Sequence, residues 1–146
     1  MGMEEAEKYA GLLEAAKQKS PGWQGDFAMM RHTSVYDNED DRAASMHALR
    51  NVLGKFGNLM MKKGDVVNGF PDNVPLEELE GNVRVDPEML ETNLMFGSPD
   101  QVVEKLKKYE ALGVDSFIYY ASMGLDRGVQ KRSMQLFIDY VMPEFS

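Results

Sequence analysis

The sequence predicts an α/β fold built on parallel strands, and the order of its elements is the main evidence. Helical and strand patterns alternate along the 146 residues as helix, strand, helix, long connection, strand, helix, strand and helix. This alternation indicates parallel strands, because a chain that re-enters a sheet in the same direction needs a crossover. Parallel sheets are covered on both faces, so a set of only three strands favours part of a larger α/β structure.

Composition excludes several classes of protein. The formal net charge of -8 at pH 7 argues against a nucleic acid or an anionic membrane as partner, since either requires a basic surface. The absence of cysteine removes disulfides, a thiolate nucleophile and a cysteine-ligated zinc. No run reaches the roughly 20 apolar residues of a membrane span, and the charged N-terminal residues lack the apolar segment of a signal peptide. A cytoplasmic protein is therefore expected.

Residues 1–19 predict the first helix, with an amphipathic pattern that begins at Glu4. Acids stand near its start and lysines near its end, as the helix dipole favours. One face collects apolar side chains and is expected to be buried: Ala6, Tyr9, Ala10, Leu13 and Ala16. A proline and two glycines in residues 20–26 then predict a loop.

Residues 27–36 predict the first strand, because they combine β-branched residues with an aromatic end. Alternation sorts them onto two sides, with Phe27, Met29, Arg31, Thr33 and Val35 on one and Ala28, Met30, His32, Ser34 and Tyr36 on the other. Acids at 37–41 then begin a helix that continues to Leu53. Gly54 and Gly57 leave the end of this helix open.

Residues 64–91 are predicted to form a long connection, because turn residues dominate them. Leu76 to Glu80 allow at most one helical turn, and another short helix is expected at Pro87–Glu91. Residues 92–96 (TNLMF) are a short apolar run and predict the second strand.

Residues 97–99 (GSP) predict the turn from this strand to the next helix. Ser98 suits the N-cap, the proline suits the first helical position, and Gln101 completes an S-x-x-Q capping box. The helix then runs to Leu112 and stops at Gly113. The caps explain this turn without a bound phosphate, which the neighbouring acid would repel.

Residues 115–122 (DSFIYYAS) predict the third strand, because they are rich in aromatic and apolar residues. A last helix follows, and its expected buried face carries Met134, Phe137, Ile138 and Val141.

Three stretches carry a family resemblance when they are taken together. They are residues 26–43 (DFAMMRHTSVYDNEDDRA), residues 93–120 (NLMFGSPDQVVEKLKKYEALGVDSFIYY) and residues 132–145 (RSMQLFIDYVMPEF). In order and spacing they resemble the sixth strand, the G-[ST]-P-x-x-V segment from strand seven to strand eight, and the closing helix of the bacterial-luciferase-like flavin-dependent monooxygenases. That family folds as (β/α)8 barrels.

The resemblance implies a partial (β/α)8 TIM barrel in which residues 1–146 form one segment of about the last three βα units. Strands one to five, with most of the flavin phosphate site, have no counterpart here. The family implies reduced flavin mononucleotide (FMN), O2 and a small organic substrate, although some relatives use a deazaflavin or no cofactor. We therefore expect the isolated chain to be inactive, and its open strand edges to be covered by a homo-oligomer or by a missing N-terminal half.

Active sites of such barrels lie at the carboxyl ends of the strands. The resemblance therefore points to six candidates for a substrate or flavin pocket: Arg31, Thr33, Tyr119, Tyr120, Ser122 and Met123. Sulfonate-oxidising relatives hold an anionic group with an inward arginine at the position similar to Arg31. Where Thr33 stands they carry a histidine, so their mechanism does not transfer directly.

Each candidate also has a structural interpretation. Arg31 would pair with an acid such as Asp26 or Asp115, or would reach solvent. The two tyrosines would pack in the core, and Ser122 would cap the last helix.

The histidines and acids give no catalytic or metal site. His32 is expected to be a packing residue, because no nucleophile or orienting carboxylate stands beside it. His47 is expected to lie on the surface of its helix, because its neighbours are polar. The acids at 37–41 begin like a calcium loop, but Arg42 replaces the required glycine, so no metal is expected. Because no complete catalytic set is present, a non-catalytic interaction or regulatory module is the alternative function.

Overall fold

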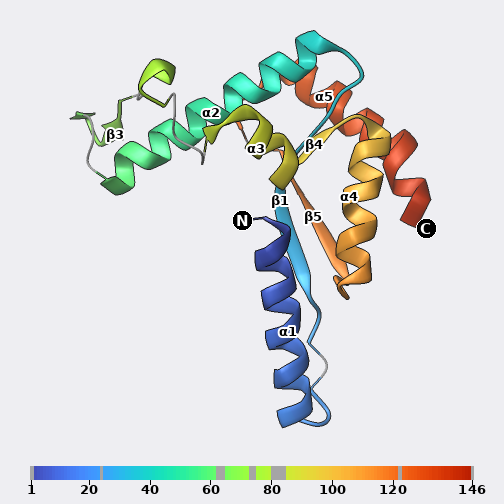
Figure 1. The fold of residues 1–146 in the computed structure, drawn as a ribbon. Coiled ribbons are helices and arrows are strands. Elements are labelled where there is room, and N and C mark those ends of the chain that lie inside the picture. Colours follow the sequence, from blue (N-terminus) through green and yellow to red (C-terminus); the bar gives the residue numbers. More distant parts are fainter. Residues whose placement is uncertain are drawn as a thin grey trace.

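The structure, a computed structural model, is built around a three-stranded parallel sheet with the strand order β4-β1-β5 (Figure 1). It describes residues 2–23, 25–61, 65–72, 75–79, 85–121 and 123–145. The strands are β1 (Ala28–Val35), β4 (Met95–Gly97) and β5 (Ser116–Tyr120). The predicted α/β fold is confirmed, and a parallel sheet flanked by helices is consistent with part of a βα barrel.

The central strand β1 pairs with a different neighbour along each half of its length. Residues 28–32 pair with residues 116–120 of β5, and residues 33–35 pair with residues 95–97 of β4. In a closed barrel each strand lies next to the following one in the chain, whereas here β1 separates β4 from β5. Both outer strands therefore have a described strand partner on one side only.

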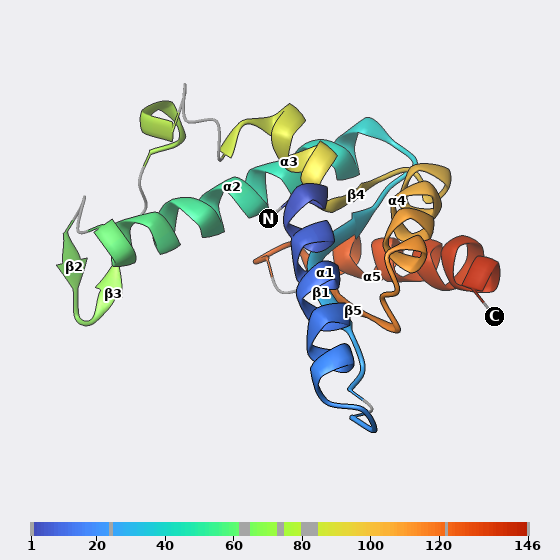
Figure 2. The same cartoon turned by 60° about the horizontal axis from the view of Figure 1, so that its bottom comes forward.

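The helices lie on both sides of the sheet and at the ends of its strands (Figures 1 and 2). They are α1 (Met3–Lys19), α2 (Glu39–Met61), α3 (Pro87–Asn93), α4 (Pro99–Ala111) and α5 (Arg127–Leu136), which continues as a π-helix (Phe137–Val141) and a 3₁₀ turn (Met142–Phe145). The far end of α2 carries a small antiparallel hairpin of β2 (Val66–Val67) and β3 (Phe70–Pro71) away from the sheet (Figure 2). None of the described helices is long and apolar enough to cross a membrane.

Two apolar clusters hold the sheet between its helices. One joins α1, α4 and the π-helix to one face of the sheet through Ala6, Met29, Val35, Met95, Val102, Leu106, Tyr109 and Val141. The other joins α2, α3 and the segment after β5 to the opposite face through Tyr36, Met46, Ala48, Leu49, Leu90, Phe96 and Met123. Burial alternates along the first half of β1 as predicted, whereas residues 33–35 are all buried because helices cover both faces there.

The second strand begins later than predicted, because a helix takes its first two positions. Thr92 and Asn93 belong to α3, and β4 starts only at Met95. The side chain of Asp86 caps α3 by accepting from the Met89 N–H at 3.0 Å. An apolar run is ambiguous between helix and strand, and here the cap upstream decides it.

The helix α2 passes through Gly54 and Gly57 and ends at Met61. Its far end is held by a tertiary contact, since the amide of Asn58 donates to the Asp72 carbonyl at 3.0 Å. The residues predicted as a long connection contain β2, β3, a 3₁₀ turn (Leu76–Leu79) and the start of α3, as far as the structure describes them.

Two predicted helix faces are only partly buried. In α1, Ala6 is fully buried, but Tyr9 is 45% exposed. In the last helix, Val141 is buried, whereas Met134 and Ile138 are exposed. The π-helical turn explains the exposure of Ile138, because an i→i+5 turn rotates its side chains away from the face that a regular helix would present, whereas Met134 precedes that turn.

Candidate functional site

The carboxyl ends of the three strands lie at one edge of the sheet, which we call the strand-end edge. It is defined by Tyr36 after β1, Gly97 and Ser98 at the end of β4, and Tyr120 and Met123 at and after the end of β5. This is the edge at which parallel α/β barrels carry their active sites. The candidate site is therefore sought there first.

At the turn of Gly97 and Ser98, the capping of α4 uses the polar groups of Ser98. The Ser98 hydroxyl accepts from the Gln101 N–H at 3.4 Å, and the Gln101 side chain accepts from the Ser98 N–H at 2.8 Å. Gly97 has φ +153, and a Cβ there would lie 2.7 Å from Oε1 of Gln101. The predicted capping box is confirmed, and the turn positions the strand end without needing a ligand.

Arg31 and Thr33 lie on the sheet face that α1 and α4 cover. The Arg31 side chain is 7% exposed, its Nη1 donates to the Met30 carbonyl at 2.9 Å, and its guanidinium lies 5.5 Å from the centre of the Tyr109 ring. Its Nε and Nη2 have no hydrogen-bond partner within the described residues. Thr33 is buried and donates to the Arg31 carbonyl at 2.9 Å.

The sequence offered two structural interpretations of Arg31, an ion pair with Asp26 or Asp115 and a solvent-exposed side chain, and neither is seen in the described residues. Arg31 is buried and not in solvent, and no described ion pair joins it to Asp26 or Asp115. The Asp115 carboxylate instead accepts from the Phe27 N–H at 2.8 Å.

Tyr119 shares the helix-covered face and joins a buried hydroxyl pair. Its hydroxyl lies 2.7 Å from Oγ of Ser133 in α5, and its ring meets Phe137 edge-on at 5.0 Å. Burial raises the pKa of Tyr119. The Ser133 hydroxyl also accepts from the Val35 N–H at 2.7 Å. It thereby gives a partner to a backbone N–H of β1 beyond the point where the pairing with β5 ends. Arg31, Thr33 and Tyr119 therefore face the helices and not an open pocket.

Tyr120 points the other way and lies against His32. The two ring centres are 4.5 Å apart on the face of the sheet opposite Arg31, and the residues are register partners in β1 and β5. Tyr120 is 36% exposed, and His32 is half-buried with no described partner for its Nδ1. Burial lowers the pKa of His32, which favours the neutral imidazole at neutral pH.

The sequence did not single out His32 as a site residue, although a signal for it was present. Alternation already placed His32 opposite Arg31 and on the side of Tyr36. Only the register of β1 against β5 shows that it meets Tyr120. The sequence does not fix that register.

Met123 lies at the bottom of a hollow between α2 and the segment after β5. The hollow has a volume of about 430 Å³, and Met123 is 1% exposed. The polar side chains of its α2 wall are His47, Asn51 and Lys55, which lie one helical turn apart, and Asp126 lies in the wall formed after β5. His47 is exposed, as predicted. Ser122 lies outside the described residues. The lysine, amide and imidazole are donors suited to a polar or anionic group.

Near the strand-end edge, Tyr36, Glu91 and Arg42 form a network in which they hydrogen-bond to one another. The Tyr36 hydroxyl donates to Glu91 at 2.7 Å, and Arg42 donates to both oxygens of the same carboxylate at 2.6 and 3.1 Å. Burial and the Glu91 carboxylate raise the pKa of Tyr36, while the Arg42 hydrogen bonds lower that of Glu91. This network fastens α2 to α3 and leaves no free acid or base.

An ion pair fastens α2 to α5 in the same region. Two nitrogens of Arg132 donate to the two carboxylate oxygens of Asp41 at 2.8 and 2.5 Å, and Asp41 is buried while Arg132 is exposed. These hydrogen bonds lower the pKa of Asp41. A lowered carboxyl pKa stabilises the folded state at pH values above the unfolded pKa of about 3.9, and this contribution is lost as pH falls through the folded pKa.

We therefore expect Asp41→Asn to lower the thermal midpoint at pH 7 and to flatten the loss of stability below about pH 4. Thermal unfolding followed by circular dichroism between pH 3 and 7 measures both effects. Asp40→Asn, at an exposed acid beside it, is the control and should leave the pH profile unchanged. Parallel pH profiles for the wild type and Asp41→Asn would contradict the assignment.

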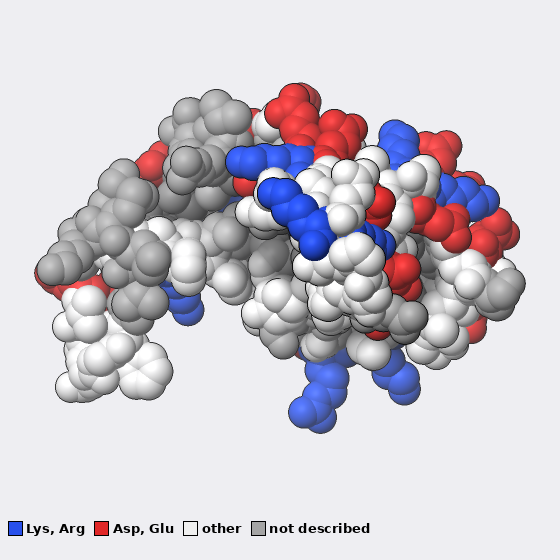
Figure 3. Space-filling model, turned by 90° about the horizontal axis from the view of Figure 1, so that it is seen from below, with Lys and Arg blue, Asp and Glu red and all other residues white. Residues whose placement is uncertain are grey.

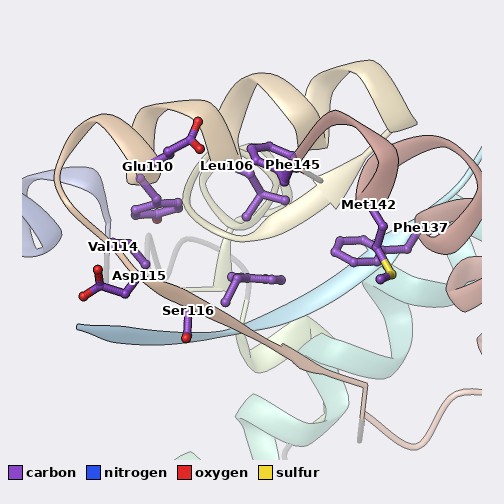
Figure 4. A pocket seen from close by; sticks show the side chains of 10 residues that line it. Leu106, Glu110, Val114, Asp115, Ser116, Phe137, Met142 and Phe145 are labelled. Atoms are coloured by element: carbon purple, nitrogen blue, oxygen red, sulfur yellow. The ribbon is translucent and has the colours of Figure 1, made fainter. Parts of the chain in front are cut away.

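A larger hollow of about 680 Å³ adjoins the Tyr36, Arg42 and Glu91 network at the strand-end edge. A further hollow lies at the opposite end of the sheet (Figure 4). It has a volume of about 470 Å³ between α4, the start of β5 and the last helical turns, with Leu106, Phe117, Phe137 and Phe145 in its wall. Its polar side chains include Asp115, which already binds the Phe27 N–H. The hollow lies at the amino end of β5, away from the strand-end edge, so we do not assign the candidate site to it.

The face seen in Figure 3 and the described residues can be searched for a basic surface and for a metal site. Lysines and arginines are interspersed with acids on the face in Figure 3 and do not form one basic surface. Among the described residues no group of three His, Asp or Glu side chains could hold a metal ion.

The fold places the chain in the class of α/β proteins with parallel strands and flanking helices, and this arrangement is consistent with part of a βα barrel. The chain is also 28% identical over 147 aligned residues to the flavin-dependent trigonelline monooxygenase, oxygenase component, of Acinetobacter baylyi. The alignment covers 100% of this chain and 41% of that protein, in its C-terminal part. The chain thus spans less than half the length of this relative.

No family model matches the chain. The alignment confirms the relationship that the sequence motifs predicted, namely to the C-terminal part of a flavin-dependent monooxygenase.

Proposed function

We propose that this chain supplies the C-terminal part of the oxygenase component of a flavin-dependent monooxygenase that oxygenates a small organic substrate. The observation that carries the proposal is the alignment of the whole chain with the C-terminal part of such a component. The strand-end edge supports it, because barrel enzymes bring their reacting groups together there.

Reduced FMN is the proposed cofactor, and the sheet face that carries His32 and Tyr120 is where this chain would contact it. The His32 and Tyr120 rings, whose centres are 4.5 Å apart and whose planes are tilted by 33°, are partly exposed and give an aromatic contact suited to a flavin ring. The donors Asn51 and Lys55 in the hollow beside Met123 could bind a polar group of flavin or substrate. These residues fit part of a flavin site, so the isolated chain is proposed to bind flavin weakly and to be inactive.

When bound, reduced flavin supplies the electrons with which O2 is activated for oxygenation. The chain's residues would orient the ring and keep water away from it. His32 is neutral at neutral pH, because burial lowers its pKa, and can accept or donate one hydrogen bond there. Arg31, Thr33 and Tyr119 would act by positioning β1 and β5. They lie on the helix-covered face, where Thr33 bonds to the backbone of β1 and Tyr119 bonds to Ser133 of α5.

A non-catalytic interaction module is the second candidate. The observation that favours it is that two acids near the strand-end edge are already bound to arginines, Glu91 to Arg42 and Asp41 to Arg132. Localisation in the cytoplasm is part of the proposal for either function.

A chimera tests the proposed function. The aligned C-terminal part of the Acinetobacter relative is replaced by this chain, and binding of reduced FMN and flavin-dependent oxygenation of trigonelline are measured. We expect micromolar FMN binding and measurable turnover, and no submicromolar binding by the isolated chain. Tyr120→Ala in the chimera should weaken FMN binding about tenfold, whereas Tyr140→Ala, at a 61% exposed tyrosine in the π-helix, should not. A folded chimera that binds no FMN would refute the proposal.

A further inference from the structure

The hollow at the amino end of β5, which we call the amino-end hollow, is polar at one end and apolar at the other. Figure 4 shows Glu110 and Asp115 at one end and Phe137 and Met142 at the other. Its volume of about 470 Å³ lies within the range of roughly 300–1,000 Å³ that is usual for ligand pockets. The hollow therefore has the size and the polarity for a small molecule with a charged end and an apolar body.

The polar end of the amino-end hollow receives negative charge from three sources. The Glu110 carboxylate has no hydrogen-bond or ion-pair partner among the described residues. Asp115 uses Oδ2 to accept from the Phe27 N–H at 2.8 Å, and its other carboxylate oxygen has no described partner. The helix α4 ends at Ala111, beside Glu110, and a helix C-terminus carries the negative end of the dipole. All three sources favour a cation.

Positive side chains do not neutralise this end. The described lining of the hollow contains no lysine, arginine or histidine. Lys108, in the same helical turn as Glu110, lines a different hollow, and Lys107 is paired with Glu144 at 3.2 Å. Arg31 lies 5.5 Å from the centre of the Tyr109 ring in the wall, but its own side chain is buried and does not line the hollow. The two carboxylates outnumber this one buried cation, so the hollow favours a positive ligand.

The apolar end is shaped by the π-helix. The Met142 N–H donates to the Phe137 carbonyl, which is an i→i+5 hydrogen bond. In a regular α-helix, residues five apart point about 140° apart, whereas the wider turn brings Phe137 and Met142 into one wall. The Phe137 ring stacks on Phe117 with 6.2 Å between the ring centres, and Phe145 completes the apolar wall. Such turns are rare in helices and frequent at functional sites, and this one forms a surface for an apolar body.

We propose that the amino-end hollow binds a small amphipathic organic cation. The cationic group binds at Glu110 and Asp115, and the alkyl or aryl body packs against Phe117, Phe137 and Phe145. The phenylalanine rings suit such a ligand, because their faces attract cationic groups as well as apolar ones. An anionic ligand is disfavoured, because both carboxylates repel it. The site lies away from the strand-end edge, so it is separate from the proposed flavin surface and does not depend on the proposed function.

Three probes with the same alkyl chain and different charges test the proposal: octylammonium, 1-octanol and octanoate. Each is titrated into the chain at neutral pH, without flavin, and binding is measured by isothermal titration calorimetry. We expect a Kd of about 50 μM for octylammonium. Binding of octanol should be at least about tenfold weaker, because it lacks the charge, and octanoate should not bind measurably.

Variants of the two carboxylates place the cationic group. Glu110→Gln and Asp115→Asn should each weaken octylammonium binding about three- to fivefold and leave octanol binding unchanged. The amide oxygen introduced at 115 can still accept from the Phe27 N–H, so this variant keeps the contact with β1. The matched control is Glu104→Gln, which removes the same charge from an exposed acid of α4 that lines a different hollow. It should change the affinity by less than about twofold.

A variant of the apolar wall places the alkyl chain. Phe145→Ser, at a 38% exposed position, should weaken octylammonium and octanol alike by about fivefold. Tyr140→Ser, at a 61% exposed tyrosine outside the hollow, is its control and should change neither. All these positions are exposed, so the variants should retain the wild-type circular dichroism.

Three results would overturn the proposal: no binding of octylammonium at about 1 mM, equal binding of octylammonium and octanol, or octylammonium binding that neither carboxylate variant weakens. Equal binding would show that the hollow takes apolar molecules irrespective of charge. Because no flavin is present and no turnover is measured, failure here is distinct from failure of the chimera.

Discussion

Replacing Phe96 by alanine is expected to lower the free energy of unfolding by about 3–5 kcal/mol. Phe96 is 1% exposed at the centre of the cluster that joins α2, α3, β4 and the segment after β5. Its neighbours come from four separate elements, so they cannot close the cavity by a local shift. Urea unfolding followed by circular dichroism measures the loss.

The control for this prediction is Phe70→Ala, because Phe70 is a phenylalanine that is 77% exposed in the hairpin. It should change the free energy of unfolding by less than about 0.5 kcal/mol. Equal losses for the two variants would show that the Phe96 cluster does not hold the fold together.

Replacing Lys105 by methionine is expected to lower the free energy of unfolding by about 2–3 kcal/mol. Its ammonium, on α4, donates to the carbonyls of Leu94 at 3.0 Å and Phe96 at 2.7 Å and also to that of Glu91. Lys105 is half-buried, and burial lowers its pKa. It therefore satisfies the carbonyls where α3 ends and β4 begins.

Methionine keeps the length and apolar character of the lysine stem, so this variant removes mainly the three hydrogen bonds. Lys108→Met, on an exposed lysine of the same helix, is the control and should change stability by less than about 0.5 kcal/mol. Thermal and urea unfolding measure both variants. A loss below about 0.5 kcal/mol for Lys105→Met would contradict its role as the cap of α3.

The two expected effects concern the structure that positions the proposed site. Phe96 and Lys105 fix the end of β4, and β4 pairs with the end of β1, where the strand-end edge begins. If the chain contributes to a flavin-dependent oxygenase, as we propose, these residues act by holding that edge in place, while His32 and Tyr120 supply the contact surface.

Local sequence patterns predicted the turn at Ser98 in full. The serine, the proline and Gln101 act within one helical turn, so their hydrogen bonds depend on no distant residue. The helix at Glu39 and the strand at Ala28 were likewise predictable, because acid-rich helix starts and alternating apolar residues are local signals.

The strand at residues 92–96 shows where local patterns fail. Its apolar run fits a helix end as well as a strand, and the choice depends on the Asp86 cap and on Lys105, which lies on a different helix. The candidate site shows the same limit. Alternation assigned Arg31 and His32 to opposite faces, but it could not say which face the helices cover.

The sequence by itself determined the α/β order of elements, the capped turn and the relationship to flavin-dependent monooxygenases, because these depend on local hydrogen bonding and on motif spacing. Only the tertiary structure decided that β1 lies between β4 and β5, that Arg31 faces the helices and that His32 meets Tyr120. Strand order and register arise from contacts between residues far apart in the chain, whose free energies no local window of sequence contains.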